Sequence, residues 1–195
     1  GDFSWLPATA VTQTLTVSKA VVTLTGDNKS KTYGDANPEL TITYSGFKNS
    51  ETASVLDTAP SLTTTATTTS NAGTYPITAS GGADNNYSFS YTAGTLTVNK
   101  ATLTATADNK TRLYGDANPA FTISYSGFKN NETASVIDTA PTASTTAVAT
   151  SNVGTYTITA ASGTDNNYTF SYTAGTLTVN KATLTATADN KTRVY

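Results

Sequence analysis

The sequence contains no cysteine, no methionine and no histidine. Without cysteine the chain has neither a disulfide framework nor a thiolate metal site. With histidine also missing, a catalytic nucleophile would need a lysine or a carboxylate as its partner. Charged residues make up 12% of the chain and the net charge is −2, whereas ~25% of an average soluble domain is charged. We therefore expect no basic surface for nucleic acid or for anionic lipid.

Long apolar segments are also missing. No run approaches the ~20 residues that a membrane-spanning helix needs, and no signal-peptide pattern is present, so we expect the fragment to be internal to a longer chain. Threonine is abundant instead and alternates with tyrosine, phenylalanine, isoleucine, leucine and valine. Because the branched threonine side chain suits a pleated surface, this alternation is typical of β-structure.

A period of 81 residues organises the chain. Lys19, Lys100 and Lys181 are 81 residues apart, and residues 20–100 align with residues 101–181 without a gap and with 58 of 81 positions identical. A fixed long period indicates a tandem repeat. We predict four parts: the tail of an upstream module (1–19), two repeats (20–100 and 101–181), and the first strand of a truncated third repeat (182–195).

Period-2 patterns predict the strands of each repeat. The segment 129–138 interrupts them, and there Asn130 or Asn131 can cap a short helix that has Glu132 in its first turn and an apolar stripe of Ala134, Val136 and Ile137. Pro141 prevents this helix from continuing. The predicted fold is mostly β (α+β), with five to six strands and one short helix in a β-grasp-like unit. An Ig-like β-sandwich is the alternative. In the second repeat the predicted strands are 102–107, 121–125, 142–150, 156–160, 168–172 and 177–179.

Consecutive repeats are joined without a linker. The segment GTLTVNK that ends at Lys100 runs directly into ATLTATA, and no Gly/Ser-rich or Pro-rich stretch separates the two. Such a join should be stiff, since few bonds are free to rotate between two paired strands. The stub 182–195 holds one strand, which needs a neighbouring module to become stable.

An ordered set of motifs identifies a resemblance. The strings LTVNKATLTATADNKTRLYGDANP, SGF, GTY and NNYTFSYTAGTLTV resemble the MBG family (mostly beta, glycine-rich; YGX type) over both repeats and the stub. Residues 1–18, which hold Trp5, resemble the end of a bacterial Ig-like module. The MBG resemblance implies a non-catalytic repeat of a large bacterial surface adhesin, located outside the cell. It implies no catalytic residues and no cofactor.

The motif YGDANP offers one candidate metal site. Asp35 and Asn37, with Asp116 and Asn118 in the second repeat, carry the carboxylate and amide oxygens that calcium prefers. The alternative is a tight turn in which glycine adopts a positive φ and proline ends the loop. Few other carboxylates lie within sequence reach, so the turn is the favoured interpretation.

Three further patterns have a functional and a structural interpretation. Asp57-Thr58-Ala59 and Asp138-Thr139-Ala140 resemble a short O-glycosylation motif, or they begin the turns before Pro60 and Pro141. Lys100 and Lys181 can form isopeptide crosslinks or be exposed junction lysines. The recurrent aromatic residues can stack on sugar rings, or they form the core, as their strand spacing favours. The aromatic positions are 75, 87, 89 and 91, and 156, 168, 170 and 172.

These observations give two hypotheses and exclude little else. Catalysis has weak support, because the only acid–base candidates, Glu51/Asp57 and Glu132/Asp138, look like helix-terminal charges. The leading hypothesis is a stalk repeat that projects a distal binding domain, with neighbouring repeats of the same chain as its partners and a monomeric state. The alternative is a repeat that binds surface glycans or host proteins weakly and in many copies.

Overall fold

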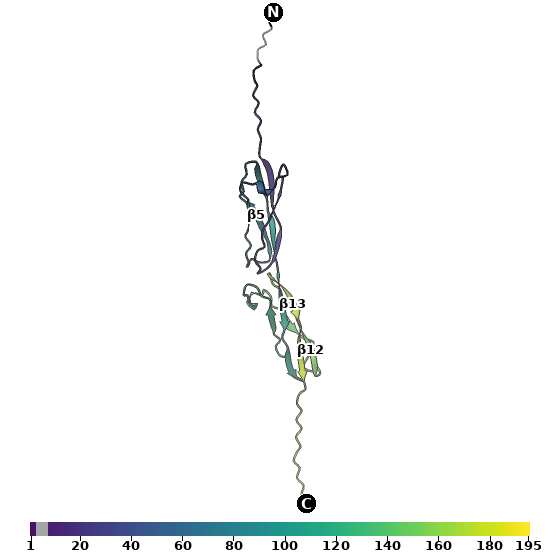
Figure 1. The fold of residues 1–195 in the computed structure, drawn as a ribbon. Helices are drawn as coiled ribbons and strands as arrows, with labels where there is room; N and C mark the ends of the chain where they lie inside the picture. Colours follow the sequence, from purple (N-terminus) through teal and green to yellow (C-terminus); the bar gives the residue numbers. More distant parts are fainter. Residues whose placement is uncertain (3–7) are drawn as a thin grey trace. The chain divides into compact units, whose positions relative to one another are not determined.

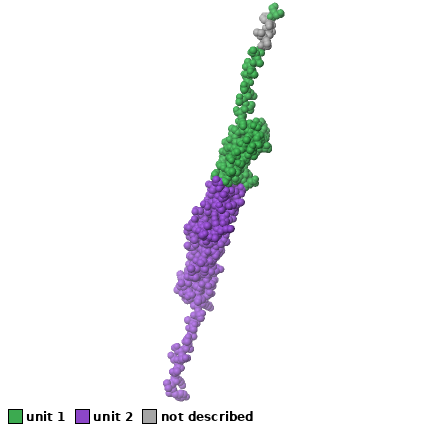
Figure 2. Space-filling view, turned by 90° about the vertical axis from the view of Figure 1, so that its left-hand side faces the viewer, with its two compact units in different colours: residues 1–28, 39–64, 76–95 green, residues 29–38, 65–75, 96–195 purple. Residues whose placement is uncertain are grey.

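The computed structural model describes residues 1–2 and 8–195, so the prediction for Trp5 lies outside the described residues. The chain divides into two compact units (Figure 2). Unit 2 contains the whole second repeat together with two segments of the first repeat. Unit 1 comprises residues 1–28, 39–64 and 76–95, and unit 2 comprises residues 29–38, 65–75 and 96–195.

Each repeat contains two sheets, and alternating burial along the strands accounts for them. In β8 (Ala101–Ala107), for example, the alanines and Leu103 are buried while Thr102 is exposed. The further strands of the second repeat are β9 (Lys110–Leu113), β10 (Ile123–Ser126), β11 (Thr142–Ser144), β12 (Gly154–Ala161), β13 (Tyr168–Thr173) and β14 (Gly175–Asn180). They form the sheets β10-β8-β13 and β11-β12-β14-β9, and β12 and β13 are labelled in Figure 1.

The first repeat has the same order of strands. They are β1 (Ala20–Gly26), β2 (Lys29–Thr32), β3 (Ile42–Ser45), β4 (Ser61–Thr64), β5 (Gly73–Ser80), β6 (Tyr87–Thr92) and β7 (Gly94–Asn99). The sheets are β3-β1-β6 and β2-β7-β5-β4. Both are mixed: β1 pairs with β3 antiparallel and with β6 parallel, and β2 pairs with β7 parallel while β4 pairs with β5 antiparallel.

A pair of parallel strands bends from one sheet into the other in each repeat. Partners are 67 residues apart on both sides of the bend, as in Ala20↔Tyr87 and Lys29↔Leu96. At the bend a Cβ on Gly94 would lie 2.2 Å from the carbonyl oxygen of Gly26, so the two backbones approach too closely for any side chain. Glycine is required there because its backbone can make this close contact.

The prediction that the chain is mostly β is confirmed, but the predicted helix is wrong. Asn130 and Asn131 have φ values of 52° and 59°, in the left-handed region, so neither can begin an α-helix. The segment forms only a short 3-10 helix, η2 (Ala134–Val136), and its counterpart is η1 (Ala53–Val55). Throughout residues 1–2 and 8–195 there is no α-helix, and each repeat has seven strands instead of five to six.

The absence of that helix also changes the fold class. A β-grasp-like unit needs a helix packed on its sheet, and the described residues do not supply one. The alternative Ig-like sandwich consists of antiparallel sheets, whereas β1 and β6 run parallel here. The observed repeat is therefore a seven-stranded unit of two mixed sheets.

Small apolar clusters form the cores. In unit 1 the buried residues are Val22, Leu24 and Tyr87, against which Ala20, Ile42, Tyr44, Phe47 and Phe89 pack. In unit 2 one cluster contains Ala107, Ala147, Ile158, Ala160, Leu177 and Val179. A second cluster in unit 2 combines residues of both repeats, as the next subsection shows.

The segments that flank the repeats form no strands. Residues 8–19 and 181–195 have no strand partner, and their side chains are exposed. A single strand without a partner is not stable, which accounts for the lack of structure in 182–195. The division of the chain into an upstream tail, two repeats and a third stub stays a prediction.

Candidate functional site

The YGDANP motif forms a tight turn at the end of β2 and again at the end of β9. Gly34 and Gly115 adopt φ values of 84° and 91°, as the turn interpretation requires. The Asn37 amide nitrogen donates to the carbonyl oxygen of Ala66 over 2.7 Å, and Asn118 donates to Ala147 over the same distance. The amide side chains therefore tie each turn to the loop that precedes β5 or β12.

A buried cation completes each turn, and the sequence gave no warning of it. Lys31 is 7% exposed, and its ammonium donates to the carbonyl oxygens of Asp35 over 3.0 Å and Thr67 over 2.5 Å. Arg112 replaces Lys31 in the second repeat, where its guanidinium donates to Asn118 Oδ1 over 2.8 Å and to the carbonyl oxygen of Val148 over 2.5 Å. A buried cation needs such acceptors, because its desolvation would otherwise be very costly.

The calcium candidates are thus placed, but in separate contacts. Asp35 Oδ1 lies 3.0 Å from the Lys129 ammonium, and Asn118 Oδ1 accepts from Arg112. Asp116 is exposed. Within the described residues, no three Asp or Glu side chains gather closely enough to hold a metal ion. The calcium alternative is untested.

The Asp35 turn leads to a joint between the two repeats, which lies wholly in unit 2. Tyr33 follows β2 and is 4% exposed, because it packs against residues of the second repeat. Its ring meets the ring of Tyr168 edge-on, with the centroids 5.5 Å apart and an angle of 82° between the planes. Edge-to-face pairs are the favoured geometry for two aromatic rings. The buried members of this shared cluster are Tyr33, Val98, Ala101, Leu103 and Tyr168.

One carboxylate receives the hydroxyl groups of both tyrosines. Tyr33 donates to Glu132 Oε1 over 2.5 Å, and Tyr168 donates to Glu132 Oε2 over 2.6 Å. The backbone nitrogen of Lys129 donates to the Tyr168 hydroxyl over 2.8 Å. Hydrogen bonds to a charged acceptor are shorter and stronger than neutral ones. Glu132, predicted to be a helix-terminal charge, instead lies before η2 and links the first repeat to the second.

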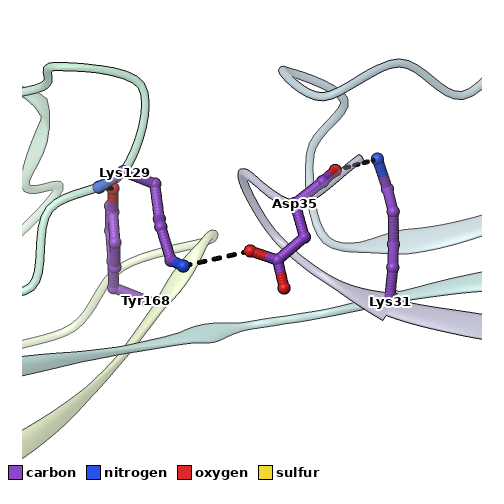
Figure 3. A network of polar contacts seen from close by, with 4 residues as sticks. All are labelled: Lys31, Asp35, Lys129 and Tyr168. Carbon is purple, nitrogen blue, oxygen red and sulfur yellow. Dashed lines mark hydrogen bonds and ion pairs between the residues drawn. The ribbon is translucent and has the colours of Figure 1, made fainter. Parts of the chain in front are cut away.

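Two further polar contacts connect the repeats. Figure 3 shows the Lys129 ammonium reaching Asp35, whose carbonyl oxygen accepts from Lys31. The Asn167 side chain accepts from the backbone nitrogen of Ala72 over 2.9 Å and donates to Asn71 Oδ1 over 3.1 Å. We call the residues of the first repeat the plug (Tyr33, Asp35, Asn71 and Ala72) and those of the second repeat the socket (Lys129, Glu132, Asn167 and Tyr168).

Burial and the shared carboxylate alter the titration of the joint tyrosines. Burial, and then the hydrogen bond to Glu132, raise the pKa of Tyr33 above its ordinary value, and the same causes raise the pKa of Tyr168 strongly. Both effects favour the neutral phenol, which donates to the carboxylate. The joint is therefore built for protonated tyrosines.

The contact between plug and socket leaves no space for a side chain at Gly34. A Cβ at Gly34 would lie 2.4 Å from the Cβ of Lys129, whereas nothing lies within 4 Å of a Cβ at Gly115. Gly34 therefore has two reasons to be glycine: its positive φ and its closeness to Lys129.

The other candidate positions have structural contacts. Asp57 Oδ2 accepts from the backbone nitrogen of Asn85 over 3.0 Å, and Asp138 Oδ2 accepts from Asn166 over 2.9 Å. Lys100 is exposed between β7 and β8, and its ammonium donates to the carbonyl oxygen of Asp165 over 2.8 Å. Glycosylation and isopeptide crosslinks stay predictions, as does the role of Lys181.

The recurrent aromatic residues are divided between core and surface. Tyr87 and Tyr168 are buried, as the strand spacing predicted. Phe89 and Phe170 are partly buried and pack on the clusters. Tyr91 and Tyr172, however, are 43% and 40% exposed. These two remain the positions at which a sugar ring could stack.

Sequence reasoning located the joint only in part. It placed the join at Lys100 and inferred stiffness from the missing linker, but it named none of the plug or socket residues as contacts. The signal was weak, because plug and socket have the same identities in both repeats (Tyr33/Tyr114, Asp35/Asp116, Lys129/Lys48 and Glu132/Glu51). Only the structure distinguishes the partnered copy from the unpartnered one.

The family model for the MBG domain (YGX type) matches residues 22–97 and 103–178, which is more than half of the chain. The chain belongs to this family. Its two MBG matches lie in the two repeats, and the resemblance inferred from the ordered motifs is thereby confirmed. No protein with a curated description is similar enough to the chain to count as a relative.

Membership in the MBG family supports a coarse statement of function. Tandem MBG domains are typical of repeats in bacterial surface proteins, and such repeats are generally non-catalytic. Family membership thus suggests a surface or secreted protein. The described part of the chain has no helix with the length and hydrophobicity that a membrane crossing needs.

Proposed function

We propose that the chain is a stiff stalk segment of a bacterial surface adhesin, in which each MBG repeat adds length and each joint resists bending. The joint carries this proposal: plug and socket share an apolar cluster, two tyrosine hydroxyl groups on one carboxylate, an ion pair and two asparagine contacts. A flexible linker between two repeats would need none of these contacts.

Several weak contacts act together to favour one orientation of the repeats. An exposed ion pair stabilises by only about 0–1 kcal/mol, but the buried ring of Tyr33 contributes more. Because Lys100 alone separates β7 from β8, the free chain between the repeats is too short for independent motion without breaking the joint. Bending therefore requires that Tyr33 leave its cluster.

The matched variants Tyr33→Ala and Tyr114→Ala test this proposal. Tyr33 is buried in the joint, while its equivalent Tyr114 is 46% exposed. Residual dipolar couplings would be measured for both repeats in the wild type and in each variant. We expect a single alignment tensor to fit both repeats of the wild type and of Tyr114→Ala, and separate tensors to be needed for Tyr33→Ala. Independent alignment of the wild-type repeats would contradict the stalk proposal.

The alternative, a repeat that binds glycans weakly in many copies, is favoured by one observation. Tyr91 and Tyr172 are exposed at equivalent positions of the two repeats. A glycan array with the wild type and with Tyr91→Ala/Tyr172→Ala tests it. Binding that disappears in the double variant would support a glycan-binding function, and the absence of binding by the wild type would reject it.

A further inference from the structure

The chain contains a second socket without a plug. Around Glu51 in unit 1, Tyr87 donates to Glu51 Oε2 over 2.5 Å, and the backbone nitrogen of Lys48 donates to the Tyr87 hydroxyl over 2.9 Å. These contacts reproduce those of Tyr168, Glu132 and Lys129. In the described part of the chain, however, no second tyrosine reaches Glu51. Lys48, Glu51, Asn86 and Tyr87 line an open cavity of about 410 Å³.

The chain also contains a second plug without a socket, in unit 2. Tyr114 occupies the position of Tyr33, and its backbone nitrogen donates to the carbonyl oxygen of Asn180 over 2.8 Å, as Tyr33 does to Asn99. Asp116, Asn152 and Val153 occupy the positions of Asp35, Asn71 and Ala72. Yet Tyr114 is 46% exposed where Tyr33 is 4% exposed.

We propose that these two unpartnered halves bind one another between copies of the chain: the plug of one copy, centred on Tyr114, enters the socket of a second copy, centred on Glu51. The partner is thus a second copy of this chain, and the contact repeats the internal joint. This inference does not depend on a stalk role, because it concerns only the halves that the internal joint leaves unused.

Three features favour this contact. The socket residues are identical in the two repeats, and the plug differs only by valine in place of alanine at position 153. Both halves already have the geometry that they need, so little ordering is required on binding. The charges are complementary, since Asp116 would face Lys48 as Asp35 faces Lys129.

The flanking segments need not prevent the contact. In the internal joint the connecting residue, Lys100, is exposed. Lys19 and Lys181 are its equivalents and are exposed as well, and residues 8–19 and 181–195 belong to no strand. In a complex of two copies both segments can therefore leave the contact toward solvent.

The contact is heterologous, since plug and socket are different surfaces. A heterologous contact leaves one unused half on each side, so further copies can add. The internal joint gains from the high effective concentration of covalently linked halves, and two separate copies lack this advantage. We therefore expect weak association that grows with protein concentration.

Charge reversal across the new contact provides the test. Lys48 and Asp116 are exposed, so Lys48→Asp and Asp116→Lys should fold normally, which circular dichroism checks. Sedimentation equilibrium of the wild-type chain should show head-to-tail association, and each variant alone should associate at least about tenfold more weakly because like charges then face each other. An equimolar mixture of the two variants should associate again, since each supplies the half that the other needs.

Two results would overturn the proposal. One is a wild-type chain that remains monomeric up to about millimolar concentration, the range in which weak linked contacts act. The other is association that both charge variants retain, which would indicate a different surface. Neither result bears on the internal joint, whose variant is Tyr33→Ala.

Discussion

At the scale of single residues, identical side chains have different roles according to what they face. Tyr33 and Tyr114 occupy the same place in the repeat, yet only Tyr33 is buried against a second tyrosine and bonded to a carboxylate. The same holds for Asp35, which pairs with Lys129, and the exposed Asp116. The repeat therefore supplies an internal control for each residue of the joint.

Removing one hydroxyl group from the joint should weaken it measurably. Tyr33→Phe keeps the ring but deprives Glu132 of one donor, and a hydrogen bond to a charged group contributes roughly 1.5–3 kcal/mol. Tyr114→Phe changes an exposed residue and should alter the free energy of unfolding by less than about 0.5 kcal/mol. Urea denaturation of both variants checks this expectation. Equal losses in the two variants would show that Glu132 gains nothing from Tyr33.

The joint should lose stability at alkaline pH. Burial and the bond to Glu132 raise the pKa of Tyr33 above 10.0 in the folded chain, while the unfolded tyrosine keeps its ordinary pKa. The resulting stabilisation is fully present below about pH 10 and is lost as the pH rises above 10 toward the folded-state pKa. Tyr33→Phe should therefore show a smaller decrease of the urea midpoint between about pH 9 and pH 11 than the wild type. The same decrease in both chains would contradict this linkage.

At the scale of elements, the YGDANP turn and the bent parallel strands determine what each repeat can contact. The turn was predicted from its glycine and proline, because positive φ at glycine is a local property. The bend at Gly94 was not predicted, because it depends on a backbone 67 residues away. The helix prediction failed for a related reason: Glu132 and two left-handed asparagines belong to the joint, so local helix signals did not decide their conformation.

Alanine at the turn glycine should be more harmful in the first repeat than in the second. Gly34→Ala and Gly115→Ala share the cost of a left-handed alanine, about 1–2 kcal/mol. Only the first also places a Cβ 2.4 Å from Lys129 Cβ. We expect Gly34→Ala to shift the amide NMR signals of the Lys129 and Asn167 region, and Gly115→Ala to leave them unchanged. Shifts of that region in both variants would show that Gly34 is not specific to the joint.

Calcium should not stabilise the turns. The candidate oxygen of Asp35 faces an ammonium and that of Asn118 accepts from a guanidinium, so binding calcium would first break these contacts. The melting temperature should be the same with calcium and with EDTA. A calcium-dependent increase that Asp116→Asn or Asp35→Asn removes would establish the ion site after all.

At the scale of the whole molecule, the joint makes the stability of one repeat depend on the other. In linear arrays, stability is the sum of the repeats and of the contacts between neighbours. Here Tyr33 and Val98 belong to the first repeat and Leu103 and Tyr168 to the second, yet all four share one cluster. Unfolding of either repeat should therefore expose apolar surface of the other.

Loss of the joint should uncouple the repeats during unfolding. Tyr33→Ala removes the ring that connects them, and a large-to-small change in a core costs about 3–5 kcal/mol. Calorimetry should show one transition in the wild type and in Tyr114→Ala, and a broadened or double transition in Tyr33→Ala. A single sharp transition in all three chains would mean that Tyr33 is not needed for coupling.

The sequence by itself determined that the chain is β-rich, that it repeats every 81 residues without a linker, and that it belongs with the MBG repeats. These properties follow from composition, alternation and ordered motifs, which are local or periodic. The tertiary structure decided the mixed sheets, the missing helix and the joint in which Tyr33 and Tyr168 share Glu132. Those features depend on contacts between residues 36 to 99 positions apart, and two copies of one motif differ there only in whether a partner is present.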